Sequence, residues 1–218
     1  MDMKSYVVIG LGRFGTQIAT RLYEYGKDVL VIDVEETLVD QISDHVTRAV
    51  VADAKNKDVL RGLGVSDCDC AIVALGSDLA GSILVTMNMK ALGVPHVICK
   101  ARDDTHREIL EKLGADQVII PERVVADKLA RTMASPNILE FIELSNDYGI
   151  IEYKSPKTWE NKLIKELNIR AKYGVNIIAV KKNNKVKISP SAEYTIPEES
   201  VLVLLGDYKA LEQIKRIK

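Results

Sequence analysis

The feature that most constrains this chain is a Gly-x-Gly-x-x-Gly fingerprint close to its start. A short apolar run, residues 6–9, leads into Gly10, Gly12 and Gly15, and a helix-like stretch, residues 16–23, follows at once. The first glycine permits a tight turn, the second lets the backbone approach a diphosphate, and the third lets the helix pack closely on the strand. The N-terminus of that helix offers free N–H groups to phosphate. This order therefore predicts a dinucleotide-binding unit.

An acidic residue completes the unit. A second apolar run, residues 29–32, ends on Asp33, and dinucleotide-binding units carry such an acid about twenty residues past the glycines. At the carboxyl end of the second strand, its carboxylate can accept hydrogen bonds from both ribose hydroxyls. The alternative is a tight turn that binds nothing. It explains the glycines but not the strand, helix, strand and terminal acid around them.

The first half of the chain alternates strand-like and helix-like stretches, which is typical of a parallel sheet with helices on both faces. Further strands are expected over residues 49–53, 71–76, 97–100 and 117–120. A long helix is expected over residues 80–92, and Pro121 starts another that reaches about residue 133. We therefore predict an α/β fold, a Rossmann-like doubly wound parallel sheet, for residues 1–134.

The pattern changes after this domain. Residues 135–137 form a break, because Pro136 disfavours helix in the residue before it. The next segment, residues 138–144, is too apolar for a solvated linker. We expect residues 135–145 to be a crossover helix or linker, and residues 146–218 to form a small α+β domain with a hairpin and a closing helix.

Composition narrows the class of protein. The formal net charge of −1 over 218 residues creates no global field that would recruit nucleic acid or anionic lipid. Apolar runs stay shorter than the roughly 20 residues that a membrane helix needs. No signal peptide precedes the first strand, and three cysteines do not make an even disulfide set. We expect a cytoplasmic protein that does not insert into the membrane.

The distribution of titrating residues argues against an enzyme. His45, His96 and His106 all lie in the first half, none at the carboxyl end of a predicted strand, and are expected to be structural. The second half contains no His and no Cys, so it lacks the usual general acid or base. Cys68 and Cys70 have no second clustered pair to complete a zinc site and are expected to be buried small residues.

Several residues at the predicted strand ends are candidates for nucleotide contacts. Arg13, in the first turn of a helix, opposes the helix dipole unless bound phosphate reverses the sign; the alternative is an arginine that swings into solvent. Asp53, with Ala54, could lie against an adenine or could cap the next helix. Ala74 and Gly76 permit close approach of a cofactor or simply form a turn. These residues lie on the rim where open parallel sheets bind ligands.

Two further residues of this rim carry opposite charges. Lys100 could contact phosphate or pair with an acid such as Asp103. Glu122 could ligate a divalent cation near nucleotide phosphates, but an acid that favours a helix dipole is the simpler reading. The long helix over residues 80–92 is apolar nearly all round, which is consistent with burial against both the sheet and a second subunit.

One corner of the second domain combines hydrogen-bond donors with an aromatic ring. Arg170, Tyr173 and Asn176 stand beside Ile169 and Ile177. Such a mixture suits a small planar ligand that carries phosphate. The alternative is a helix–loop–strand corner whose polar groups satisfy the backbone, and the residues alone favour that alternative.

Four motifs together resemble the cytosolic regulatory subunits of the Ktr and Trk bacterial potassium-uptake systems, built from regulator-of-K⁺-conductance (RCK) domains. The resemblance runs end to end and is closest to the Ktr-type gating-ring subunit. Its motifs are Val-Ile-Gly-Leu-Gly-Arg-Phe-Gly at 8–15, Ile-Val-Ala-Leu-Gly at 72–76, Leu-Gly-Ala-Asp at 113–116 with Pro121 and Glu122, and Ile-Arg-Ala-Lys-Tyr-Gly at 169–174 with Asn176 and Ile177.

The resemblance implies a nucleotide-sensing regulator. The first domain would bind ATP or ADP, and can bind NAD(H), with ATP activating and ADP inactivating potassium uptake. Four dimers would form an octameric ring beneath a membrane-embedded potassium-translocating subunit. Arg13 matches an arginine that reaches the γ-phosphate across the dimer, and Glu122 an acid associated with a divalent cation such as Mg²⁺ or Ca²⁺. The nucleotide-contacting positions would be Gly10, Gly12, Arg13, Phe14, Gly15, Asp33, Asp53, Ala54, Ala74, Gly76 and Lys100.

The resemblance also implies a second ligand. The corner of the second domain matches a cyclic di-AMP site between paired C-terminal domains, lined by Ile169, Arg170, Asn176, Ile177 and Pro190. Two alternatives to this reading of the whole chain are a small NAD-dependent oxidoreductase, which explains the fingerprint and Asp33 but not Arg13, and a nucleotide-binding regulator of another transporter.

Overall fold

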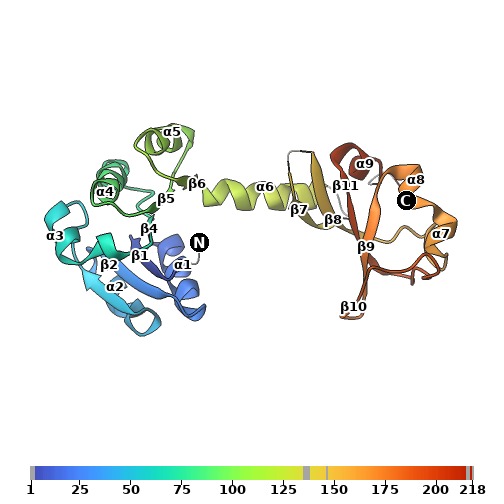
Figure 1. The fold of residues 1–218 in the computed structure, drawn as a ribbon, viewed down its shortest axis with the longest axis horizontal. Coiled ribbons are helices and arrows are strands. Elements are labelled where there is room, and N and C mark those ends of the chain that lie inside the picture. Colours follow the sequence, from blue (N-terminus) through green and yellow to red (C-terminus); the bar gives the residue numbers. More distant parts are fainter. Residues whose placement is uncertain (1–2, 135–137, 146, 215–216, 218) are drawn as a thin grey trace. The chain divides into compact units, whose positions relative to one another are not determined.

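The computed structural model describes residues 3–134, 138–145, 147–214 and 217. Contacts between Cα atoms divide the chain into two compact units, residues 1–122 and 123–218 (Figure 1). The domain limits predicted from the sequence, residues 134 and 145, stay predictions. Each unit is described by itself.

The first unit is a six-stranded parallel sheet with the strand order β3-β2-β1-β4-β5-β6. Its strands are β1 (Ser5–Ile9), β2 (Asp28–Asp33), β3 (Arg48–Val51), β4 (Cys70–Val73), β5 (His96–Lys100) and β6 (Gln117–Ile119). Its helices are α1 (Arg13–Glu24), α2 (Glu36–Ile42), α3 (Lys57–Gly62), α4 (Leu79–Ala91), α5 (Asp104–Lys112) and the start of α6 (Pro121–Ala134). The predicted Rossmann-like fold is confirmed.

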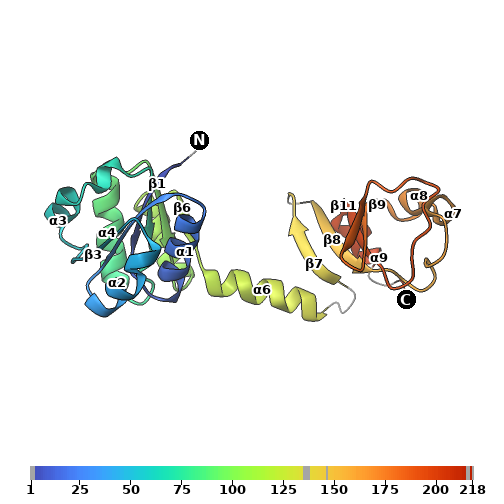
Figure 2. The same ribbon diagram turned by 90° about the horizontal axis from the view of Figure 1, so that it is seen from below.

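The central strands are apolar throughout because both faces of the sheet are covered. Val7 and Ile9 of β1 belong to one core cluster, together with Val85 and Met89 of α4. Val8, between them, belongs to the opposite cluster, which includes residues of α1 and α2. Successive residues of a strand point to opposite faces, so a sheet buried on both sides needs apolar residues at every position. Figure 2 shows helices on both sides of this sheet.

The switch point of the sheet lies between β1 and β4. The chain moves outward from β1 to β2 and β3, then returns to place β4 on the other side of β1. In open parallel sheets, ligands bind outside the carboxyl ends of the strands at such a point. The glycine turn, which follows β1 directly, therefore lies where the topology itself leaves a crevice.

The second unit is built on a five-stranded antiparallel sheet with the order β10-β9-β11-β8-β7. Its elements after α6 are β7 (Ile138–Glu143), β8 (Tyr148–Lys154), α7 (Ile164–Leu167), α8 (Ile169–Tyr173), β9 (Asn176–Lys182), β10 (Lys185–Ile188), β11 (Val201–Asp207) and α9 (Tyr208–Ile214). Asn183 and Asn184 both have positive φ angles, 49° and 59°. That conformation suits a tight two-residue hairpin turn, so the predicted hairpin is confirmed.

The segment after the first domain corrects one prediction. Residues 138–144 were expected within a crossover helix or linker, but Ile138–Glu143 form strand β7, antiparallel to β8. Phe141 and Ile142 lie opposite Ile151 and Ile150. Short apolar runs do not distinguish helix from strand by periodicity, and pairing with β8 decides the outcome here. The break predicted at residues 135–137 lies outside the described residues.

Candidate functional site

The three glycines of the fingerprint meet different surroundings. Gly10 has a φ angle of +93°, a conformation that residues with a side chain rarely adopt, and a Cβ there would lie 2.8 Å from the Leu75 side chain. A Cβ on Gly15 would lie 1.8 Å from the carbonyl oxygen of Gly10. A Cβ on Gly12 would meet nothing within 4 Å. Packing therefore requires the first and third glycines, whereas the second borders open space.

The open space at Gly12 faces the start of helix α1. Gly12 is the N-cap residue, its position carries no side-chain cap, and the first turn contains no acid. The first N–H groups of a helix lack partners within it and attract anions together with the dipole. The arrangement leaves a place for a phosphate beside a glycine that lets it approach.

Asp33 fixes the glycine turn from the end of β2. Its Oδ2 accepts a hydrogen bond from the N–H of Leu11 at 2.6 Å, and its Oδ1 accepts one from the N–H of Glu35 at 3.0 Å. Each carboxylate oxygen can accept more than one hydrogen bond. The carboxylate is partly buried, so it holds the turn and still faces the crevice where a ribose would lie.

A pocket of about 350 Å³ lies against this carboxylate. Its walls come from the ends of β1 and β2, the loop after β3, and the loop and helix that follow β4. It is lined by Ile9, Gly10, Ile32, Asp33, Val34, Ala52, Asp53, Ala54, Lys55, Leu75, Asp78 and Val85. Apolar walls with a few convergent polar groups are typical of a small-molecule site.

The structure decides between the two alternatives for Asp53. The cap of helix α3 is Asn56, whose Oδ1 accepts hydrogen bonds from the N–H groups of Asp58 and Val59. Asp53 instead accepts a hydrogen bond from the N–H of Lys55 at 3.0 Å and lines the pocket with Ala54. The helix-cap alternative for Asp53 is therefore wrong. Sequence reasoning missed Asn56, although asparagine before a helix is a recognised cap signal.

A second group of predicted residues gathers beyond the glycine turn. The ammonium of Lys100 lies 2.8 Å from Glu122 Oε1 and 6.0 Å from the centre of the Phe14 ring. Its side chain also crosses Gly76, where a Cβ would lie 3.2 Å from two Lys100 carbons. The partner of Lys100 is thus Glu122. Asp103, the acid proposed from the sequence, pairs with Arg102 and caps α5.

Neighbouring charged groups lower the pKa of Glu122. The hydrogen bond from Lys100 is the main reason why the pKa of Glu122 lies below its usual value, and the guanidinium of Arg13 also contributes. Arg13 is exposed at the first position of α1. Ala74, which follows β4, donates its N–H to Ile9 and packs near Gly15. Two cations and one carboxylate therefore border the place left for phosphate.

The described residues of one chain do not build a divalent-cation site. Among them, no group of three or more His, Cys, Asp or Glu side chains is arranged to hold a metal. One carboxylate oxygen of Glu122 is already paired with an ammonium. A cation at Glu122 would need ligands from outside the chain.

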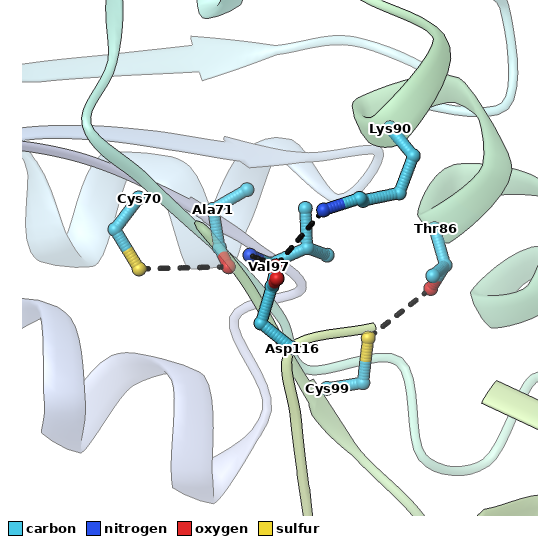
Figure 3. A network of polar contacts seen from close by, with 7 residues as sticks. All are labelled: Cys70, Ala71, Thr86, Lys90, Val97, Cys99 and Asp116. Atoms are coloured by element: carbon cyan, nitrogen blue, oxygen red, sulfur yellow. Dashed lines mark hydrogen bonds and ion pairs between the residues drawn. The ribbon is translucent and has the colours of Figure 1, made fainter. Parts of the chain in front are cut away.

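Cys70 is buried, as expected, and so is Cys99, whereas Cys68 is only partly buried. Burial is the main cause that raises the pKa of Cys68, Cys70 and Cys99 to about 11. Figure 3 shows Cys99 turned towards Thr86 of α4, with Sγ and Oγ1 3.2 Å apart, and Cys70 near the carbonyl of its neighbour Ala71. Their thiols remain protonated at neutral pH, which suits packing and not reactivity.

The polar contacts of Figure 3 join α4 to strand β5. Asp116 accepts hydrogen bonds from the Val97 N–H at 2.7 Å and from the Lys90 ammonium at 3.0 Å. Cys99, two residues along β5, contacts Thr86 of the same helix. These contacts hold α4 against the sheet at several points along its length.

His106 has a structural role, as the sequence predicted for the histidines. The imidazole is 1% exposed, and its Nε2 lies 2.6 Å from the Ser82 hydroxyl. Its Nδ1 accepts a hydrogen bond from the N–H of Arg102. Burial lowers the pKa of His106. The residue joins α5 to α4 as a neutral ring.

Helix α4 is buried towards the sheet but keeps an apolar outer side. Val85 and Met89 are fully buried, whereas Leu84 and Met87 are 41% and 47% exposed. The expectation of burial on one side is confirmed. The second contact, with another subunit, stays a prediction.

The corner of the second unit is only partly assembled in one chain. Arg170 and Asn176 are exposed, whereas Ile169 belongs to the core of the unit. The N–H of Ser189, the residue before Pro190, donates to the carbonyl of Ile178 in β9 at 2.9 Å. Its role as a ligand site stays a prediction.

Comparison with known proteins gives the family. Residues 6–121 match the TrkA-N domain and residues 150–218 the TrkA-C domain. The Ktr system potassium uptake protein A of Bacillus subtilis (strain 168) is 37% identical over 97% of this chain and 96% of its own length. The chain belongs to the Ktr/Trk potassium-uptake family. Ktr system potassium uptake protein C of the same organism is 36% identical over 98% of this chain and 96% of its own length.

The solved structures agree in fold. The GsuK channel bound to NAD matches 99% of this chain and 39% of its own, with a TM-score of 0.67 and 20% identity. This Ktr-family chain is a regulatory subunit of potassium uptake with RCK architecture, and it is not an enzyme. Family membership therefore favours the regulator over the oxidoreductase alternative. In the described part of the chain, no helix is both long and apolar enough to cross a membrane.

Proposed function

We propose that this Ktr-family chain senses adenine nucleotides, with ATP favouring potassium uptake and ADP the resting state. The observation that carries the proposal is the empty space at Gly12, beside the start of α1 and within reach of the pocket against Asp33. The pocket would hold the adenosine, with Asp33 at the ribose and Asp53 and Ala54 near the base. The phosphates would lie over the glycine turn.

Two positively charged side chains would let the protein distinguish ATP from ADP. Arg13 and Lys100 border the phosphate side, and Glu122 partly neutralises Lys100. We propose that the exposed Arg13 reaches the γ-phosphate bound in a second copy of the chain. ADP would leave that guanidinium without its partner, so ATP and ADP would favour different arrangements of the dimer. Such differential contact is what a ligand-driven switch requires.

The same pocket would also accept NAD(H). Asp33 suits the two hydroxyls of a ribose in either nucleotide, and GsuK, which shares the fold, binds NAD. A divalent cation such as Mg²⁺ or Ca²⁺ at Glu122 would take its remaining ligands from nucleotide phosphates and a second copy.

Assembly would place this sensor beneath a membrane protein. We propose that dimers form an octameric cytoplasmic ring that contacts a membrane-embedded potassium-translocating subunit. The exposed Leu84 and Met87 of α4 support contact between copies. Cyclic di-AMP would bind between paired C-terminal domains at Arg170 and Asn176, with Ile169, Ile177 and Pro190 as the apolar lining.

Titration calorimetry with ATP, ADP and NAD tests the proposal directly. Wild-type protein should bind all three and prefer ATP to ADP. Arg13→Ala should narrow that preference, because the additional phosphate loses a partner, and should leave ADP affinity within about twofold. Equal ATP and ADP discrimination in wild type and Arg13→Ala would contradict the role of Arg13. Failure of the wild type to bind any adenine nucleotide would contradict the proposed function itself.

A further inference from the structure

Helix α4 carries a buried polar residue that the proposed nucleotide contacts do not use. Asn88 is 8% exposed and stands between Met87 and Met89, in a helix whose buried apolar residues Val85 and Met89 belong to the core of the first unit. Burying an amide is unfavourable unless its polar atoms are hydrogen-bonded. Its Nδ2 donates a hydrogen bond to the backbone carbonyl of Lys55 at 3.0 Å. The partner is thus in the loop after β3 and not in the helix or the sheet beneath it.

That loop forms one wall of the nucleotide pocket. Asp53, Ala54 and Lys55 all line the pocket, and Asp53 is held in turn by the N–H of Lys55. Moving the backbone of Lys55 would therefore move the Asp53 carboxylate as well. Asn88 itself does not line the pocket, so its effect on a ligand acts through this loop.

Helix α4 holds the same loop at a second point. The ammonium of Lys55 lies 3.7 Å from Oδ2 of Asp78, the N-cap of α4, whose Oδ1 accepts a hydrogen bond from the Gly81 N–H. Both side chains of this ion pair are about half exposed, 46% and 49%. Exposed pairs contribute little to stability. The hydrogen bond from Asn88, which is partly buried, is therefore the stronger of the two attachments.

We infer that Asn88 is a positioning residue for the base-binding wall of the pocket. It holds the loop of residues 53–56 in the conformation that accepts an adenosine. Without its amide, the loop has other conformations available, and apparent affinity falls in proportion to the fraction that remains competent. This inference rests on the proposed nucleotide function and adds a residue that acts from outside the pocket.

The test compares substitutions at two positions of helix α4, Asn88 and Thr86. Asn88→Leu keeps a similar volume and removes the amide, and Asn88→Ala serves as a second variant if leucine does not fit. Thr86→Val is the control, because it removes a buried hydrogen bond of α4 to Ser82 and Cys99 and leaves the loop untouched. ADP affinity by calorimetry and hydrogen exchange of residues 53–56 are measured for each protein.

Asn88→Leu should weaken ADP binding by about fivefold, the effect of losing one typical net hydrogen bond. Its loop amides should exchange faster, whereas Thr86→Val should keep both properties within about twofold of wild type. Equal losses of ADP affinity in Asn88→Leu and Thr86→Val, or unchanged hydrogen exchange of the loop in Asn88→Leu, would overturn the inference. If the wild type binds ADP and both Asn88 variants bind it equally well, this inference fails alone. If the wild type binds no adenine nucleotide, the proposed function fails with it.

Discussion

The two glycines at the start of α1 allow packing and ligand binding to be separated by substitution. In Gly15→Ala, the new Cβ would lie 1.8 Å from the Gly10 carbonyl oxygen, and Cβ contacts under 3.0 Å are essentially never seen. The helix or the turn must therefore move by at least 3.0 minus 1.8, or 1.2 Å. Gly10 cannot readily adjust because its φ of +93° already depends on glycine.

The expected cost of Gly15→Ala follows from this displacement. Overpacking a well-packed site costs about 1–3 kcal/mol, and a backbone obstacle favours the upper end. Alanine gains about 1 kcal/mol over glycine in helix propensity, which offsets part of the loss. We expect the first unit to lose about 2 kcal/mol of unfolding free energy, and nucleotide affinity to fall because the turn is displaced.

Gly12→Ala is the matched control for stability. Its Cβ meets nothing within 4 Å, so we expect a loss of under about 1 kcal/mol, from the weaker N-cap alone. Its nucleotide affinity should nevertheless fall at least about tenfold, because the Cβ occupies the approach to the phosphates.

The assay is urea unfolding followed by circular dichroism, together with ADP titration of the folded proteins. The only tryptophan, Trp159, lies in the second unit, so its fluorescence follows that unit and serves as an internal reference. Gly15→Ala with wild-type stability would refute the packing argument. Gly12→Ala with wild-type ADP affinity would refute the assignment of its open space to phosphate.

Three further predictions concern titration and charge. Because burial lowers the pKa of His106, the native state binds fewer protons than the unfolded state, so stability should fall as pH drops through the unfolded histidine range near 6.5. His106→Gln should flatten that dependence between pH 7.5 and 5.5 in urea unfolding, and an unchanged slope would assign it to other groups. Native Cys68, Cys70 and Cys99 should react with a thiol reagent at pH 8 about a hundredfold more slowly than the unfolded chain, since pKa values of about 11 leave few thiolates; fast labelling of one thiol would contradict its burial. Lys100→Met should raise the pKa of Glu122 towards its usual value, measured by NMR titration, because the main hydrogen bond that lowers it is lost; an unmoved pKa would contradict the role of Lys100.

Much of the first unit was predictable because local signals and the fold agree. The fingerprint, Asp33 and the apolar central strands each require a buried parallel sheet, and no other arrangement satisfies all of them. The strand at residues 138–143 was not predictable, because a segment of six residues with four apolar side chains fits a helix as well as a strand. Only the pairing with the next strand, β8, decides it.

The candidate site was also predictable only in part. The residues of the rim could be named from their places at strand ends, but not their partners. Lys100 forms its ion pair with Glu122 and not with Asp103, because Asp103 is paired with Arg102 and caps the start of α5. Asn88 stands out in the sequence as a polar residue in an apolar helix. Its partner could not be predicted, because Lys55 lies 33 positions away in the sequence.

The double use of Asp33 limits how this pocket can change its choice of cofactor. The carboxylate that would face the ribose in the proposed site is the same group that accepts the hydrogen bond of the Leu11 amide at 2.6 Å. Exchanging it for a neutral or basic residue, the usual route towards a nucleotide with a 2′-phosphate, would also release the turn that receives the diphosphate. A switch of specificity here needs a second substitution that gives the Leu11 amide a new acceptor.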